Sequence, residues 1–226
     1  MAVFEDELIH LKETILKMGC LVEIAIRDSV ASLVRRDDEL AKKVIREDSK
    51  INALDIEVDE ESIRLIALRQ PKAGDLRLIT TAMKITTDLE RMGDQAVNIS
   101  RRTLELNREP VLKPYIDIPK MTIIVQEMTQ AALDAFVRKD RALALTVIAR
   151  DKDVDALKLA ILKELLIYMV NDPSTTSRGM NVSYVAHSLE RIADHATNIA
   201  EMVFYLIEGR IIRHTDILNQ TDEIPT

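Results

Sequence analysis

Apolar residues recur at steps of three and four along most of the chain. One series runs through Leu8, Leu11, Ile15, Met18 and Val22, and comparable series follow through to residue 206. Steps of three and four place apolar side chains on one side of an α-helix, so the pattern predicts long amphipathic helices. Prolines and turn-forming clusters interrupt it at five places, which are residues 36–38, 70–75, 110–119, 139–141 and 171–173. The predicted helices span 4–35, 39–69, 75–108, 119–138, 141–171 and 177–209.

The two halves of the chain resemble each other. Residues 89–99 (LERMGDQAVNI) return as residues 189–199 (LERIADHATNI), with seven of eleven positions identical. Residues 34–37 return as 137–140, and Asp48 aligns with Asp151 at the same offset. The repeat predicts an all-α fold of two tandem three-helix bundles. The expected segments are a first bundle at 1–109, a linker at 110–118, a second bundle at 119–212 and a polar tail at 213–226.

Composition supports a helical protein outside the membrane. Hydrophobic residues make up 47% of the chain and charged residues 31%, while 5 Gly and 6 Pro are too few for the turns of a β-sandwich. A net charge of −7 disfavours nucleic acid as a partner. Neither a membrane-spanning run nor a signal peptide is recognisable, which predicts a cytoplasmic protein that does not insert into membranes. The apolar neighbours of Cys20 predict an inert core thiol.

Candidate chemistry lies in the repeated motif. With Leu89 and Leu189 on the seam of each bundle, the acidic residues shared by the two copies of the motif fall on positions that face away from the seam. They are Glu90, Asp94, Glu190 and Asp194. Carboxylates four residues apart on a helix project from one side and repel each other, and a bound cation reverses that repulsion. Core packing explains the shared apolar residues but not a shared outward acidic pair. The four carboxylates are therefore candidate metal ligands.

Other interpretations of these residues stay open. Glu90 and Asp94 could form an ordinary solvated face, with Arg91 pairing to Asp94 three residues on. Asp151 and Asp155 are further candidate suppliers of ligands, with a partial counterpart at residues 48–52.

Other chemical motifs are weak or missing. His195 aligns with Gln95, which favours a surface or interhelical histidine over a metal ligand. The Glu-x-x-His motif of ferritin-like di-iron sites is missing after both Glu90 and Glu190. No Gly-rich phosphate loop occurs, and the basic pairs 35–36 and 101–102 are interpreted as solvated positions.

The chain resembles the phosphate-uptake regulator family, PhoU, over residues 4–210. The resemblance rests on residues 69–77 (RQPKAGDLR), on 88–94 (DLERMGD) and on 189–201 (LERIADHATNIAE). It implies two three-helix bundles related by a pseudo-twofold axis, and multinuclear iron or zinc sites at Glu/Asp-x-x-x-Asp motifs. Residue by residue, the family motif falls on the four carboxylates named above. The second half departs from the signature, because residues 171–173 (NDP) replace Arg-Gln-Pro.

The resemblance also implies a function. Family members act in the cytosol as negative regulators of the phosphate-starvation response, and they bind a sensor histidine kinase and the ATPase subunit of the phosphate transporter. They also form homodimers or larger assemblies. The favoured hypothesis is a non-catalytic regulatory adaptor that docks partner helices and carries no catalytic residues. The alternatives are a metal-dependent, phosphatase-like enzyme that uses carboxylate-bound ions, and a structural scaffold whose metals are adventitious.

Overall fold

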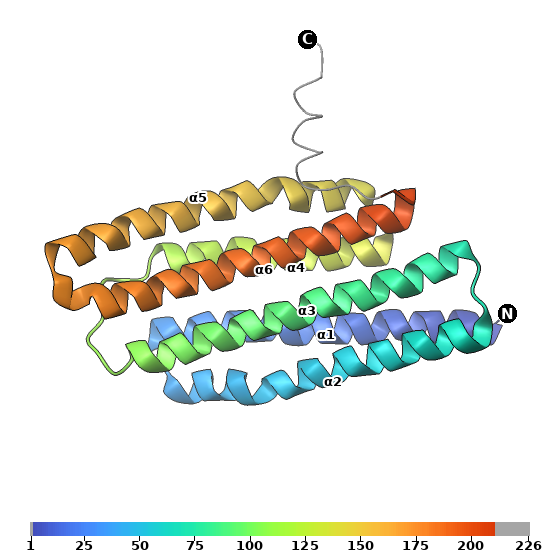
Figure 1. Cartoon of the computed structure of the whole chain (residues 1–226), viewed down its shortest axis with the longest axis horizontal. Helices are drawn as coiled ribbons and strands as arrows, with labels where there is room; N and C mark the ends of the chain where they lie inside the picture. Colours follow the sequence, from blue (N-terminus) through green and yellow to red (C-terminus); the bar gives the residue numbers. More distant parts are fainter. Residues whose placement is uncertain (1, 211–226) are drawn as a thin grey trace, which may run out of the picture.

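The computed structural model describes residues 2–210, and these residues form long helices and no strand (Figure 1). A short 3-10 turn, Pro173–Thr175, precedes the last helix. The six α-helices are α1 (Ala2–Arg35), α2 (Asp38–Arg69), α3 (Ala73–Leu106), α4 (Asp117–Arg138), α5 (Arg141–Asn171) and α6 (Thr176–Glu208). All six predicted helices are confirmed, and their ends agree with the prediction to within two residues. The predicted tail, 213–226, and the predicted end of the second bundle at 212 lie outside the described residues.

The repeated turn after the first helix of each half has a local cause. Arg36 and Lys139 take up left-handed backbone conformations, with φ of 56° and 51°. The next residue in each copy, Asp37 or Asp140, caps the following helix by accepting a hydrogen bond from a backbone N–H three residues on. The same two-residue device therefore ends one helix and starts the next in both halves.

The connection between the halves spans residues 107–116, slightly earlier than the predicted linker 110–118. The helix α4 begins at Asp117, and Pro119 lies in its first turn, where a missing N–H costs nothing. The Arg36 guanidinium donates hydrogen bonds to the carbonyl oxygens of Asn107 (2.7 Å) and Glu109 (2.8 Å). Arg36 is therefore a structural clamp on this connection, which corrects its interpretation as a solvated residue.

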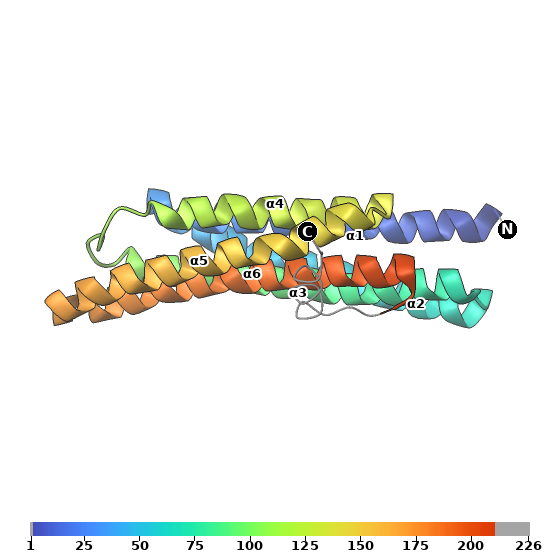
Figure 2. The same ribbon diagram turned by 90° about the horizontal axis from the view of Figure 1, so that it is seen from above.

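The two bundles lie against each other along their length. The helices α1, α2 and α3 pack together, as do α4, α5 and α6, and the halves meet where α3 packs against α6 and α1 against α4 (Figures 1 and 2). The helices α3 and α6 run in opposite directions, and α2 and α5 lie at the periphery (Figure 1). Each helix thus has the neighbours that its counterpart has in the other half, as the expected pseudo-twofold axis requires. The all-α fold of two three-helix bundles is confirmed.

One apolar core continues through both halves. Met18 and Leu133, from different bundles, belong to the same cluster of buried side chains as the motif residues Leu89 and Leu189. The seam positions of the repeat are fully buried, which confirms the heptad assignment. Within residues 2–210 no helix combines the length and apolarity that crossing a bilayer requires.

Cys20 is exposed, so its prediction as a core thiol is wrong. Met18 and Val22 carry the buried seam of α1, and Cys20 lies between them on the opposite side of the helix. Neighbours in sequence are not neighbours on a helical face.

Candidate metal-binding surfaces

The four predicted ligands lie at the edges of the bundles rather than on open surface. The side chains of Glu90 and Asp94 on α3 are 23% and 42% exposed. Those of Glu190 and Asp194 on α6 are 15% and 35% exposed. The prediction that these positions lie off the seam holds, but each pair leans toward a neighbouring helix of its own bundle. That neighbour is α2 for the first pair and α5 for the second.

In the first half, α2 brings two more carboxylates to the predicted pair. Burial raises the pKa of Glu90, and the charges of Asp94, Asp55 and Asp48 raise it further against the opposing effect of Arg91. Burial also raises the pKa of Asp48, with a further contribution from Asp94. Compensation of the cluster is partial. Arg91 lies 3.5 Å from Glu90 and from Asp94, Asn52 donates to Oδ2 of Asp48 at 3.2 Å, and the charge of Arg101 lowers the pKa of Asp48. We call Glu90, Asp94, Asp48 and Asp55 the first acidic cluster.

Two oxygen atoms of this cluster lack partners. Oδ1 of Asp48 and Oδ1 of Asp55 are buried and accept no hydrogen bond from the residues that the structure describes. A buried carboxylate oxygen without a donor is costly, and a cation is one way to satisfy it. Gly93 lies beside this cluster, and a Cβ atom there would lie 3.2 Å from Oδ1 of Asp48.

In the second half, the side chains of Lys158, His187 and Arg191 lie beside the predicted pair. Nζ of Lys158 donates to Oε1 of Glu190 at 2.9 Å. Nδ1 of His187 lies 3.1 Å from Oε2 of Glu190, but that buried oxygen accepts no hydrogen bond from the residues that the structure describes. Arg191 pairs with Asp194 at 3.2 Å. Burial raises the pKa of Asp194, and Glu190 raises it further, whereas Arg191 and His195 lower it.

The two halves therefore differ in the charge of one residue beside the predicted ligand pair. The alignment of Asp48 with Asp151 places Asp55 opposite Lys158. An ammonium group thus occupies, in the second half, the place of a carboxylate in the first. Asp151 and Asp155 line a hollow of about 410 Å³ together with Asp194, so the structure places the further candidate suppliers beside the predicted pair. Asp55 was not among the predicted ligands, although its position seven residues after Asp48 puts it on the same helical face.

As the side chains lie, no three His, Cys, Asp or Glu residues within 2–210 converge closely enough to hold one ion. Binding of an ion would require the carboxylates of a cluster to turn toward one another.

His195 is an interhelical residue, in agreement with the favoured interpretation. Its Nδ1 lies 2.8 Å from Oδ1 of Asp88 on α3, and Asn198 donates to the same oxygen at 3.1 Å. The side chains of Asp88 and His195 are only 16% and 12% exposed. These residues join the two bundles and are committed to that contact.

Comparison with known proteins identifies the family. The model of the PhoU domain matches the chain twice, at residues 15–103 and 118–203. The chain belongs to the PhoU family. The two matches fall one on each bundle, so each three-helix bundle is one PhoU domain.

Curated and solved PhoU proteins resemble the chain over nearly its whole length. A protein of Pseudomonas aeruginosa named phosphate-specific transport system accessory protein PhoU homolog is 42% identical over 222 residues, which cover 98% of this chain and 92% of that protein. A protein of the same name from Aquifex aeolicus is 45% identical over 211 residues, 93% of this chain and 96% of its own length.

Two crystal structures share the fold. That of PhoU from Pseudomonas aeruginosa superposes with a TM-score of 0.88 at 44% identity, covering 92% of this chain and 100% of that one. That of the phosphate transport system regulatory protein PhoU from Streptococcus pneumoniae gives a TM-score of 0.86 at 28% identity, covering 93% and 99%. The predicted resemblance is confirmed.

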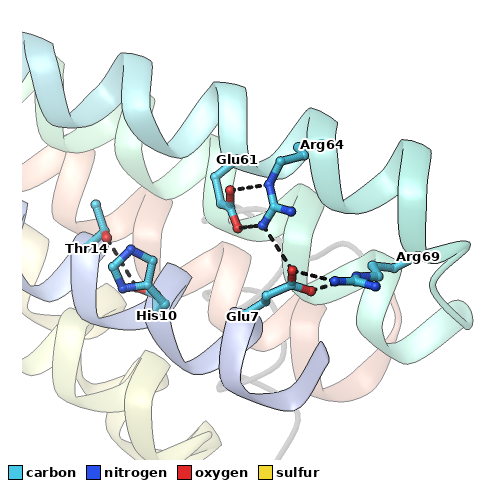
Figure 3. Close-up of polar contacts among 6 residues, drawn as sticks. All are labelled: Glu7, His10, Thr14, Glu61, Arg64 and Arg69. Carbon is cyan, nitrogen blue, oxygen red and sulfur yellow. Dashed lines mark hydrogen bonds and ion pairs between the residues drawn. The ribbon is translucent and has the colours of Figure 1, made fainter. Parts of the chain in front are cut away.

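The Arg-Gln-Pro marker of this PhoU-family chain has a structural role. Arg69, in the last turn of α2, donates to both oxygens of Glu7 on α1 at 2.8 Å (Figure 3). Arg64 bridges the same glutamate to Glu61 (Figure 3). The next residue, Gln70, ends α2 in a left-handed conformation before Pro71. The marker thus fastens the end of α2 to the start of α1 and turns the chain toward α3.

Proposed function

We propose that this chain is a cytoplasmic, non-catalytic regulator of phosphate uptake that acts by docking on other proteins. The observation that carries the proposal is the pair of PhoU domains in a chain that is more than 40% identical, over nearly its whole length, to phosphate-transport accessory proteins. The names of these relatives describe accessory proteins, so they support an adaptor over the phosphatase-like alternative.

The proposed partners are the ATPase subunit of the phosphate transporter and the sensor histidine kinase of the phosphate response. The test mixes the purified chain with each purified partner and measures complex formation by light scattering and by kinase and ATPase assays. The proposal expects direct complexes in which either activity falls. Turnover of phosphoesters by the chain, without a complex with either partner, would replace it with the enzyme alternative.

Iron or zinc at the first acidic cluster is part of the proposal. Two observations support the fit of such an ion to this cluster. Oδ1 of Asp48 and Oδ1 of Asp55 are buried without hydrogen-bond partners, and carboxylate oxygens are suitable ligands for hard and borderline divalent ions. Glu90 and Asp94 would supply the remaining oxygens from α3. A bound cation would neutralise the mutual repulsion of these carboxylates and tie α2 to α3. More than one ion could be bridged, since each carboxylate has two oxygens.

Glu190 and Asp194 are the proposed second site, and we expect it to bind more weakly. Lys158 lies where the first half has Asp55, and an ion must displace its ammonium group from Glu190. The positive charge of Lys158 repels a cation bound at Glu190. Binding at the second site therefore costs free energy that binding at the first acidic cluster does not.

The metal proposal is tested by elemental analysis of protein purified without chelators. The variant Glu90→Gln/Asp94→Asn is compared with its matched counterpart Glu190→Gln/Asp194→Asn. We expect the first variant to lose most of the bound iron or zinc and the second to lose the smaller share. Equal metal content in both variants and the unaltered protein would refute binding at these residues.

A homodimer is proposed through the outer face of α5. Leu159, Leu166 and Val170 are exposed there at steps of seven and four, with the stem of Lys163 between them. Apolar residues at this spacing form the seam of a helix pair, and two copies of one surface meet about a twofold axis. Leu166→Glu should convert a dimer to a monomer in light scattering, whereas Leu68→Glu, on exposed α2 surface, should not. A monomeric unaltered protein would refute the dimer.

A further inference from the structure

The two ends of the seam between α3 and α6 are equivalent under the pseudo-twofold axis but are not filled alike. At one end Asp88 of α3 accepts a hydrogen bond from Asn198 and contacts His195, both on α6. The Asp88 carboxylate is thus the acceptor that links α3 to α6 at that end.

At the other end of the seam, the sequence has no carboxylate at the position that corresponds to Asp88. The repeat aligns Asp88 with Ser188, His195 with Gln95, and Asn198 with Asn98. Ser188, Gln95 and Asn98 line a hollow of about 320 Å³, and the carboxylate acceptor of the other end has no counterpart among these three residues. The short serine side chain leaves space where the other end holds a carboxylate, and the amide and hydroxyl donors around that space remain.

The charge of this hollow has also changed sign. Arg101 and Arg102 line it, and the residues that align with them are Glu201 and Met202. Arg101 is exposed, and its charge lowers the pKa of Asp48 against the stronger effects that raise it. The substitution of an arginine for a glutamate thus adds positive charge at the end where a carboxylate has been lost.

Arg102 is held in place before any ligand binds. Its guanidinium lies 4.8 Å from the ring centroid of Tyr184, donates to Glu105 at 2.9 Å and lies 3.4 Å from Oδ1 of Asn181. A planar guanidinium fixed by stacking offers its remaining N–H groups in a set direction. Less freedom is lost on binding when a donor is already ordered.

We propose that this hollow binds a small oxyanion, for which inorganic phosphate is the probe, in the place that corresponds to the Asp88 carboxylate. Arg101 and Arg102 supply charge, while Asn98, Gln95 and Ser188 supply neutral donors. Arginine N–H groups match the oxygens of a phosphate in pairs, and amide and hydroxyl donors complete the shell. The inference goes beyond docking and metal binding, because it gives the chain a site for the ion whose uptake its relatives serve.

Neighbouring acidic groups set the conditions for binding. Glu105 lines the hollow and is paired with Arg102, and His187 at its edge lies beside Glu190. Arg101 forms no ion pair within 4 Å among the residues that the structure describes, although its charge acts on Asp48. Phosphate binding should therefore weaken as added salt screens the charge of Arg101.

The experiment is titration of the full chain with inorganic phosphate in chelator-treated buffer, followed by calorimetry and phosphorus NMR. Sulfate is the second anion and chloride the screening salt. We expect saturable phosphate binding that weakens about tenfold or more in Arg101→Gln, as for loss of one charge-assisted hydrogen bond. Ser188→Asp should abolish binding by returning the carboxylate of the other end. Arg138→Gln, an exposed arginine on α4, is the matched control and should bind as the unaltered protein does.

Absence of saturable phosphate binding by the unaltered chain would overturn the proposal. So would unchanged affinity in Arg101→Gln, a surface change that leaves the core intact even where Ser188→Asp does not fold. Neither result bears on the complexes with the ATPase and the kinase, so failure of this site and failure of the proposed function are distinguishable.

Discussion

Gly93 and its counterpart Ala193 give a stability test built into the repeat. Both residues are buried at the same helical position, one in each bundle. Replacement of a helical glycine by alanine stabilises by about 1 kcal/mol through backbone entropy. Burial of the added methyl group contributes roughly 0.8 kcal/mol more.

Two contacts oppose this gain at Gly93. The new Cβ would lie 3.1 Å from Cδ1 of Ile51 and 3.2 Å from Oδ1 of Asp48. Ile51 also lines a hollow of about 170 Å³ beside Gly93, so its terminal methyl group has space to move away. We therefore expect Gly93→Ala to stabilise the protein by a net ~1 kcal/mol, which corresponds to a melting temperature about 2–4 °C higher.

The mirror variant, Ala193→Gly, should lose about 2 kcal/mol, since it forfeits both favourable contributions and leaves space for a methyl group. The assay is urea unfolding of metal-free protein followed by circular dichroism, with both variants compared with the unaltered chain. A destabilised Gly93→Ala would refute the reasoning by showing that Ile51 cannot yield. If Ala193→Gly leaves the free energy of unfolding unchanged, the contributions assigned to helix propensity and to burial of the methyl group are refuted.

Three further outcomes follow from polar contacts. Arg69 holds the pKa of Glu7 below its usual value, so Glu7→Gln should lower the melting temperature at neutral pH. This deficit should vanish as pH falls through the depressed pKa, because Glu7 then loses its charge in the unaltered protein too; a pH-independent deficit would contradict it. Burial and Asp94 raise the pKa of Asp48, so Asp48→Asn should raise the melting temperature of metal-free protein above that pKa, with the gain fading at lower pH. Asp88→Ala should cost about 1–2 kcal/mol in urea unfolding by stranding the donors of α6, and an unchanged midpoint would show that this contact adds nothing.

Local features of this fold were predictable from local sequence. Apolar steps of three and four located the helices, because each buried face needs only its own helix to be recognised. The Asp37 and Asp140 caps and the left-handed residues before them lie within the repeated segments 34–37 and 137–140, so the interruptions marked true ends.

Contacts between distant segments were not predictable in the same way. Periodicity shows which face of α3 is apolar but not which helix covers its flanks, so the contact of Asp88 with His195 and the approach of Asp55 to Glu90 emerged only from the structure. The wrong prediction for Cys20 also arose because sequence neighbours do not reveal which face of a helix a side chain occupies. Its sequence neighbours are apolar, yet the helix turns its side chain to solvent.

The pairing of α3 with α6 and of α1 with α4 has an evolutionary consequence. Each half presents to the other a surface that the other half also carries, so an ancestral chain with one bundle would have met a second copy of itself about a true twofold axis. Fusion of two such copies into a single polypeptide would have freed the two copies of every position to change separately. Lys158 opposite Asp55, and Ser188 opposite Asp88, are divergences that a symmetric assembly of identical subunits could not have accumulated on one side alone.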